Sequence, residues 1–117
     1  MGESNTKITY DENEDIVNFS RGKSSKASIE VGDFIIDIGS NGFVSAIEIL
    51  NASENLNISK EILNNIQGAK MSVLYKPNYL FIAITLNLRG IEKDIRIPLT
   101  INLGHNKVEK EEMIFVG

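Results

Sequence analysis

Two long segments in the second half of the chain alternate apolar and polar residues with a period of two. The apolar residues of the first are Leu80, Ile82, Ile84, Leu86 and Leu88, and those of the second are Ile95, Ile97, Leu99, Ile101 and Leu103. Successive side chains of a β-strand point to opposite faces, so this period predicts two strands with one core face each. A turn at Arg89-Gly90 joins them into a long antiparallel ribbon, and Pro98 places the second strand at an edge or a bulge.

Shorter apolar segments in the rest of the chain are separated by turn-forming residues. The expected strands lie at residues 7–10, 16–20, 27–31, 34–38, 43–50 and 71–76. The acidic stretch from Asp11 to Asp15 suits a hairpin loop, and Gly39-Ser-Asn-Gly42 contains residues that tolerate positive φ. The pattern predicts successive antiparallel hairpins, with a further turn at Pro77-Asn78.

One segment follows the helical period instead. Ser59 can cap a helix whose apolar stripe contains Ile62, Leu63 and Ile66, and Gly68 suits the left-handed residue that ends a helix. We expect one short α-helix near residues 59–67.

The expected fold is mainly β, a β-rich α+β arrangement of about seven strands. Antiparallel hairpins form a meander that makes either a sheet with the helix packed on it, or a small sandwich or partly open barrel. A length of 117 residues fits a single domain. We expect disorder at residues 1–6, a β module at 8–53, a helix plus β-hairpin extension at 54–104, and a charged tail at 105–117 with an apolar end. That end can dock on its own sheet or add a strand to a neighbour's edge.

Composition excludes several classes of function. Cysteine is absent, which rules out thiol catalysis and zinc–thiolate sites and fits a reducing compartment. A net charge of −4 argues against a nucleic-acid binder, because recognition of the phosphate backbone needs a basic surface. No stretch resembles a signal peptide or a membrane span. We therefore expect a cytoplasmic protein without nucleic-acid or membrane partners.

The first half of the chain carries a recognisable pattern. Its elements are Tyr10-Asp11, Asp15, the Gly42 turn, and Ile47-Glu-Ile-Leu50 followed by Ala52-Ser53. Over Ile8 to Ser53 the chain resembles the family of small prokaryotic proteins called domain of unknown function 2283. It has Ala46 where that pattern has a glycine, and from Leu56 onward it looks like an addition to the usual short module. The resemblance implies a small β-rich cytoplasmic module, not known as an enzyme, that some genomes encode beside small toxin-like proteins in the manner of an antitoxin.

Acidic residues provide the candidate polar sites. Asp11 and Asp15 belong to a loop that could bind a hard cation, but its spacing lacks the alternating ligands of a calcium loop, so turn formation is preferred. Glu48 lies among apolar residues and could be a buried acid with a raised pKa. No second catalytic group is fixed near it, and we expect it to face solvent or a partner. His105 follows Gly104 and is expected in a solvated loop.

The sequence therefore predicts no enzyme, no cofactor and no metal site. The leading hypothesis is a protein-interaction module, antitoxin-like as the resemblance implies, that binds a small protein partner. The expected interaction residues are Asp11, Asp15, Glu48, Met113, Ile114, Phe115 and Val116. One alternative is a homo-oligomeric structural protein whose edge strand and tail pair with copies of itself, and another is a β-domain that binds a small ligand or a cation.

Overall fold

The structure is a computed structural model that describes residues 6–117. These residues form nine strands and two short helices, which confirms the β-rich fold class. The first half contains β1 (Lys7–Asp11), β2 (Ile16–Ser20), β3 (Ala27–Val31), β4 (Phe34–Ile38), β5 (Val44–Ile49), α1 (Ala52–Leu56) and α2 (Lys60–Leu63). The second half contains β6 (Gly68–Lys76), β7 (Tyr79–Leu88), β8 (Ile91–Leu99) and β9 (Glu109–Val116).

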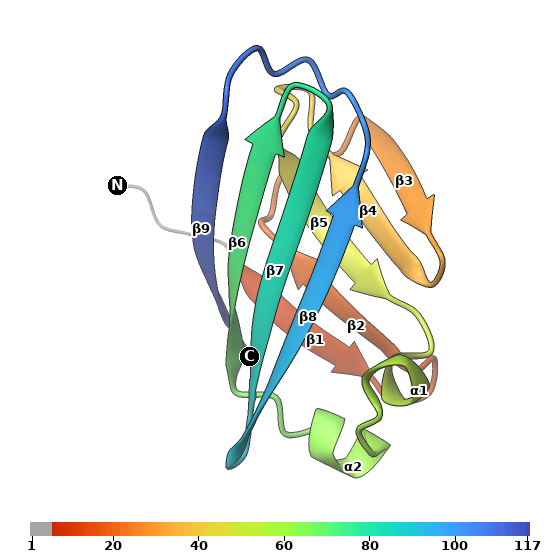
Figure 1. Ribbon diagram of the computed structural model, residues 1–117. Coiled ribbons are helices and arrows are strands. Elements are labelled where there is room, and N and C mark those ends of the chain that lie inside the picture. Colours follow the sequence, from red (N-terminus) through yellow and green to blue (C-terminus); the bar gives the residue numbers. More distant parts are fainter. Residues whose placement is uncertain (1–5) are drawn as a thin grey trace.

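The nine strands of the described residues belong to one sheet that curls into two layers (Figure 1). The strand order is β3-β4-β5-β2-β1-β9-β6-β7-β8. Every pair of neighbours is antiparallel except β1 and β9, which are parallel and meet through the single residue pair Lys7–Val116. This narrow contact is the corner of the curled sheet. Strands β1 to β5 form the first layer, and β6 to β9 form the second layer.

The core fills the space between the two layers. The inward residues of β7 are those that the alternation predicts: Leu80, Ile82, Ile84, Leu86 and Leu88 are all buried. Phe115 of β9 packs edge-to-face on Phe19 of the first layer, with ring centroids 5.5 Å apart, a preferred aromatic geometry. The segments expected as a β module and as an extension therefore contribute to the same core.

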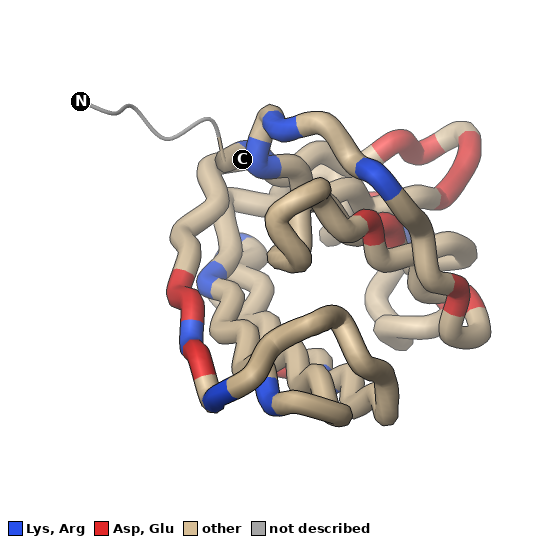
Figure 2. Tube along the Cα trace, turned by 90° about the horizontal axis from the view of Figure 1, so that it is seen from above, with Lys and Arg blue, Asp and Glu red and all other residues tan. Residues whose placement is uncertain are grey.

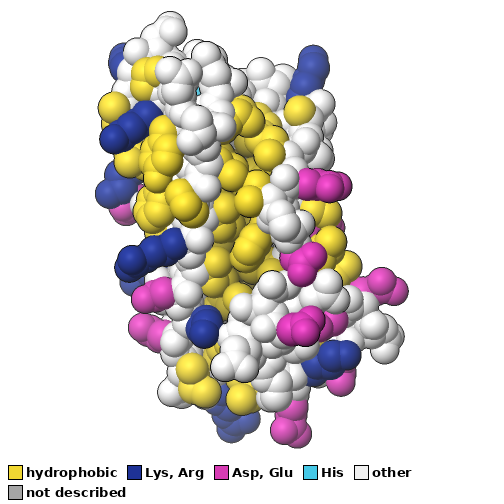
Figure 3. Space-filling view, turned by 45° about the vertical axis from the view of Figure 1, so that its right-hand side comes forward, with side chains coloured by type: hydrophobic (Ala, Val, Ile, Leu, Met, Phe, Trp, Pro, Cys, Tyr) yellow, Lys and Arg dark blue, Asp and Glu magenta, His cyan; other side chains and the backbone are white. Residues whose placement is uncertain are grey.

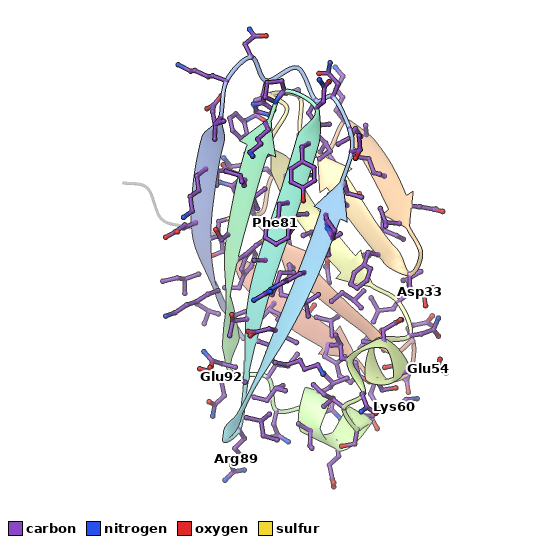
Figure 4. All side chains as sticks on the ribbon, viewed as in Figure 1. Asp33, Glu54, Lys60, Phe81, Arg89 and Glu92 are labelled. Atoms are coloured by element: carbon purple, nitrogen blue, oxygen red, sulfur yellow. The ribbon has the colours of Figure 1, made fainter. Side chains whose placement is uncertain are left out.

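The two helices close one end of this core. Ala52, Leu56 and Leu63 are their buried residues. Asn55 Nδ2 donates a hydrogen bond to Asp33 Oδ2 at 2.9 Å, which ties α1 to the turn between β3 and β4, beside which Figure 4 labels Asp33. Neither helix, nor any other in residues 6–117, has the length and apolar character needed to cross a membrane.

The loop of residues 100–108 closes the other end, where it crosses from β8 to β9 (Figure 1). It touches the tight turn between β4 and β5 at Gly42, whose φ is +85°. A Cβ atom on Gly42 would lie 3.0 Å from the Leu103 carbonyl oxygen, so glycine is required both by the turn and by this close approach.

The tail predicted at residues 105–117 is mostly a strand of the sheet. β9 pairs along its whole length with β6, so the apolar end docks on its own sheet. At the start of the described range, the Thr6 hydroxyl donates a hydrogen bond to the Ile114 carbonyl at 2.5 Å. Thr6 is thus held in place. The predicted disorder at residues 1–6 otherwise concerns residues 1–5, which lie outside the described residues.

The helical region differs from the expectation of one helix near residues 59–67. Ser59 caps α2 as predicted, since its hydroxyl accepts the backbone N–H of Ile62 at 3.3 Å, but α2 ends at Leu63 and α1 precedes it. Gly68 is not a helix stop, because it begins β6. A Cβ atom there would lie 2.7 Å from the Phe115 carbonyl oxygen, so Gly68 allows β9 to approach.

The final strand of the predicted ribbon is also shorter than expected. β8 ends at Leu99, and the alternation at Ile101 and Leu103 continues into the loop. Both residues remain half-buried against the core, so the apolar pattern was correct about burial and wrong about strand pairing. Pro98 lies on an edge strand, as predicted, because β8 is the last strand of the sheet.

Candidate functional site

The open side of the curled sheet lies between its two edge strands. β3 and β8 stand at the ends of the strand order, and among the described residues each pairs with one neighbour, β4 and β7 respectively. An edge strand presents backbone N–H and C=O groups that no neighbouring strand binds. Two edges of this kind, β3 and β8, flank the same opening.

The floor of this opening is apolar. Figure 3 shows hydrophobic side chains gathered in a furrow on this side of the molecule. The half-buried residues that pack against the core from the two edges and their neighbours are Ile29, Val31, Phe34, Leu99 and Ile101. We call the opening lined by these five residues the side groove. Exposed apolar surface with a polar rim is typical of interaction sites.

The two edges are protected to different degrees. β8 carries Pro98 and the exposed charged residues Glu92, Asp94 and Arg96, which are features that discourage strand addition. β3 carries a single charged residue, Glu30. The β3 edge is therefore the better acceptor of an additional strand.

A polar network joins the two layers near the end that loop 100–108 covers. The Tyr75 hydroxyl accepts a hydrogen bond from the backbone N–H of Val44 at 2.8 Å and donates one to Glu111 Oε1 at 2.6 Å. Arg21 Nη1 donates to Glu111 Oε2 and to the Val44 carbonyl, each at 3.0 Å. Burial, together with the hydrogen bond to Glu111, raises the pKa of the Tyr75 hydroxyl. This network ties the first layer to the second through Val44 and Arg21 on one side and Tyr75 and Glu111 on the other.

His105 is buried beside this network, which contradicts the expectation of a solvated loop residue. Its ring centroid lies 4.6 Å from that of Tyr75 and 4.9 Å from that of Phe43. Nε2 donates to the Gly42 carbonyl at 2.8 Å, and Nδ1 lies 3.4 Å from Glu109 Oε2. The expectation failed because the polar loop between β8 and β9 folds over the end of the core and carries the ring inward.

Asp11 and Asp15 shape the first hairpin and its contact with α1. Asp11 Oδ1 accepts the backbone N–H of Glu14 at 3.1 Å, as a turn residue does. Asp15 accepts the Tyr10 hydroxyl at 2.7 Å and the N–H and hydroxyl of Ser53 at 3.0 and 2.6 Å. Burial alone would raise the pKa of Asp15, but these hydrogen bonds outweigh it and lower the pKa from 3.8. Within residues 6–117, no group of three or more His, Cys, Asp or Glu is placed to hold a metal ion.

The other predicted interaction residues lie on separate surfaces. Glu48 is half-buried on the outer face of the first layer, between Asn18 of β2 and Ile35 of β4. In β9, Met113 and Phe115 belong to the core, whereas Ile114 and Val116 are exposed on the outer face of the second layer. The structure therefore does not bring the acidic loop, Glu48 and the tail into one site.

Sequence reasoning missed both the side groove and the polar network. The alternation of Ile29 and Val31 predicted a half-buried strand, but the position of a strand in a sheet depends on pairings distant in sequence. Arg21 lies in a polar segment between two expected strands, and Glu111 lies in the stretch that was expected to be a charged tail, so neither was expected in a structured site. The one available signal was Tyr75 at an inward position, because a buried hydroxyl needs a polar partner.

A second hollow, of about 190 Å³, lies between the loops that follow β2 and β4. Its polar lining includes Arg21, Lys23, Ser24, Ser40 and Asn41. Hydroxyl and cationic groups of this kind suit an anion. Arg21 is already paired with Glu111.

Comparison with known proteins gives the relationships of the chain. The family model described as protein of unknown function (DUF2283) matches residues 7–53, which confirms the resemblance over Ile8 to Ser53. An uncharacterized protein of Methanocaldococcus jannaschii is 42% identical over 114 residues, covering 95% of this chain and 97% of that protein. A Methanosarcina mazei protein named "Putative hypoxanthine phosphoribosyltransferase" is 43% identical over 88 residues, covering 73% of this chain and 72% of that protein.

The relative from Methanocaldococcus jannaschii matches over nearly its whole length, so it shares the segment from Leu56 onward as well as the first half. No solved structure matches the chain significantly. Residues 7–53 belong to the DUF2283 family of proteins of unknown function, and the chain as a whole belongs with the uncharacterized protein of Methanocaldococcus jannaschii.

Proposed function

We propose that this protein is a non-enzymatic interaction module that binds an extended segment of a protein partner in the side groove. The observation that carries the proposal is that the unpaired edges β3 and β8 flank an apolar floor (Figure 3). An extended segment satisfies the backbone groups of an edge by adding a strand, and its alternate side chains cover the floor.

The β3 edge determines what such a segment looks like. Ile29 and Val31 are two residues apart on the inner face of β3, so the added strand presents apolar side chains at every second position. Its other side chains face outward on the side that carries Ser28 and Glu30. A partner with hydroxyl or basic residues at those positions is favoured, because Glu30 lies next to them.

The antitoxin-like role implied by the family resemblance is one form of this function, in which the bound segment belongs to a small protein. The shape of the side groove favours such a segment but does not specify which partner protein contains it. The chemistry of the segment, alternating apolar residues in an extended conformation, is what can be tested directly.

The test uses short random peptides displayed on phage and selected against the folded protein. We expect the selected peptides to alternate apolar and polar residues, and their synthetic versions to protect the backbone amides of β3 from hydrogen exchange. Replacement Ile29→Lys places a charge on the groove floor and should weaken binding at least about tenfold, as loss of a central apolar contact does.

The matched control is Ser28→Lys, which adds the same charge to the outer side of the same strand, opposite Asp37, and should weaken binding much less than Ile29→Lys because it leaves the groove floor apolar. Circular dichroism establishes that both variants fold. If selected peptides bind Ile29→Lys as well as the wild type, or protect amides elsewhere and leave β3 exchanging, the side groove is not the binding site.

A second candidate function rests on the polar hollow of Lys23, Ser24 and Ser40. The name of the Methanosarcina mazei relative is that of a phosphoribosyltransferase, and a hollow with cationic and hydroxyl groups suits a phosphate group. Calorimetric titration with inorganic pyrophosphate tests this function. Binding that is lost in Lys23→Ala and kept in the nearby surface variant Lys26→Ala would favour it, and no heat of binding would remove it.

A further inference from the structure

The outer face of the second layer is the other surface of the molecule with unusual apolar content. Three of the four exposed large hydrophobic side chains in residues 6–117 come from β9 or the residue before it, namely Val108, Ile114 and Val116, and the fourth is Ile91 of β8. On the same face Leu74 and Phe81 are half-buried, and Figure 4 labels Phe81 on β7. This face is separate from the side groove, because the groove is lined by the inner residues of β3 and β8.

Two neighbouring rows of side chains cross this face from β9 to β8. The small row consists of Glu112, Ser72, Ala83 and Arg96, which are consecutive partners in the strand register. The large row consists of Lys110, Leu74, Phe81 and Pro98, which are consecutive partners one step further along the strands. A hollow of about 430 Å³ lies over Glu112, Ser72 and Ala83 of the small row and extends over the row beyond it, formed by Ile114, Lys70 and Thr85.

On three of the four strands the two rows are complementary to each other, in size on β6 and β7 and in charge on β9, whereas on β8 the rows carry Arg96 and Pro98. Leu74 and Phe81 are large where Ser72 and Ala83 are small, and Lys110 is cationic where Glu112 is anionic. Figure 2 shows acidic and basic positions following one another along β9. A surface that carries two complementary rows side by side matches a copy of itself, because a two-fold axis between the rows exchanges them.

We propose that two copies of this chain associate face to face through the outer faces of their second layers. The two-fold axis crosses the strands between the small row and the large row. Phe81 of each copy lies over Ala83 of the other, Leu74 lies over Ser72, and Lys110 pairs with Glu112. The hollow over the small row receives the side chains of the large row, with the two sheets crossing at about −30° as packed sheets do.

The size of the face sets the strength of this association. Four strands about 4.8 Å apart and eight residues long, at about 3.3 Å per residue, give roughly 500 Å² in projection. Interdigitated side chains bury more than the projected area, which brings each copy towards the about 800 Å² of a standard interface. The dimer is therefore expected to dissociate on dilution. Lys110 and Glu112 also pair within one chain at 3.2 Å, and both are exposed, so exchanging partners costs little.

The test is sedimentation velocity over a range of concentrations with two charge-reversal variants. Lys110→Glu gives each copy two acidic residues at this position, and Glu112→Lys gives each copy two basic residues. Each variant alone should be shifted strongly to monomer, because like charges then face each other across the axis. Their mixture should form dimers again, since the basic chain meets the acidic chain.

This rescue cannot come from the pair within one chain, because neither variant contains it, and it shows that both variants are folded. A third variant, Ala83→Leu, fills the hollow without adding charge and should also reduce dimerisation. The control is Ile35→Lys on the outer face of the first layer, which should leave dimerisation unchanged. A wild type that stays monomeric at every concentration, or a mixture that behaves as the sum of its two parts, overturns the proposal.

Discussion

The Tyr75 hydroxyl on β6 lies 2.6 Å from Glu111 Oε1 on the neighbouring strand β9 and also accepts the backbone N–H of Val44 in the first layer. One hydroxyl group therefore connects both layers of the curled sheet. Arg21 binds the same carboxylate and the same residue of the first layer, so Tyr75, Glu111, Val44 and Arg21 form one closed hydrogen-bond network. Among the described residues, no buried side-chain nitrogen or oxygen atom lacks a hydrogen-bond partner.

Replacement Tyr75→Phe should destabilise the protein by about 1–3 kcal/mol, because the buried Val44 N–H loses its acceptor and the half-buried Glu111 carboxylate loses a donor. Urea unfolding followed by circular dichroism measures the change. Tyr79→Phe is the control, because that side chain is half-buried on the outer face of β7 and should change stability little. An equal effect of both variants would contradict the special role of Tyr75.

Alkaline pH should destabilise the protein through the same residue. The pKa of Tyr75 is raised above its ordinary value of 10.0, so the folded state keeps the proton at a pH where the unfolded chain loses it. The contribution is complete below pH about 10 and declines as the pH rises above that value. The midpoint of thermal unfolding can be measured at several pH values between about 8 and 11. It should fall less steeply with rising pH in Tyr75→Phe than in the wild type.

Asp15 should contribute stability that acid removes. Its pKa is lowered from 3.8, so the folded state favours the carboxylate, and the contribution is present above pH 3.8 and lost as the pH falls through the folded-state pKa. Asp15→Ala should cost about 1–2 kcal/mol at neutral pH, as the loss of a capping side chain does. The wild type should lose more stability than Asp15→Asn when thermal unfolding is compared at neutral and acid pH. Parallel pH profiles of the two proteins would show that Asp15 has no linkage to protons.

Gly68→Ala should weaken the attachment of β9. The added Cβ would lie 2.7 Å from the Phe115 carbonyl oxygen, so the two strands must separate locally, at a cost of about 1–3 kcal/mol. Hydrogen exchange should increase first at the amides of β9 nearest Phe115. Lys70→Ala on the same strand changes an exposed side chain and serves as control, because it leaves the backbone spacing intact.

The local part of this fold could be predicted from the sequence. Alternation located β6, β7 and most of β8, and turn residues located the hairpins, because both depend on neighbours along the chain. The insertion of β9 between β1 and β6 could not be predicted, since hydrophobic pattern does not specify which strand pairs with which. The Gly68 interpretation failed for the same reason: a glycine needed for contact with Phe115 has the same sequence appearance as one that ends a helix.

For the candidate sites too, features that depend on local sequence could be predicted and features that depend on the assembled sheet could not. Asp11 and Asp15 were correctly interpreted as turn formers from local spacing, and Asp15 additionally holds α1 through Ser53. The side groove depends on which strands remain at the edges, and the buried position of His105 depends on where a loop crosses. Both are properties of the assembled sheet and leave little trace in any short segment.

The junction of β1 with β9 also has a consequence for how the protein is made. Lys7 meets Val116, so the sheet cannot close until the chain as far as Val116 has left the ribosome. Loop-closure entropy makes contacts of this sequence separation late and slow. During synthesis, the inner faces of β6 and of the first layer remain without β9, and a nascent chain is exposed to aggregation until β9 has been made.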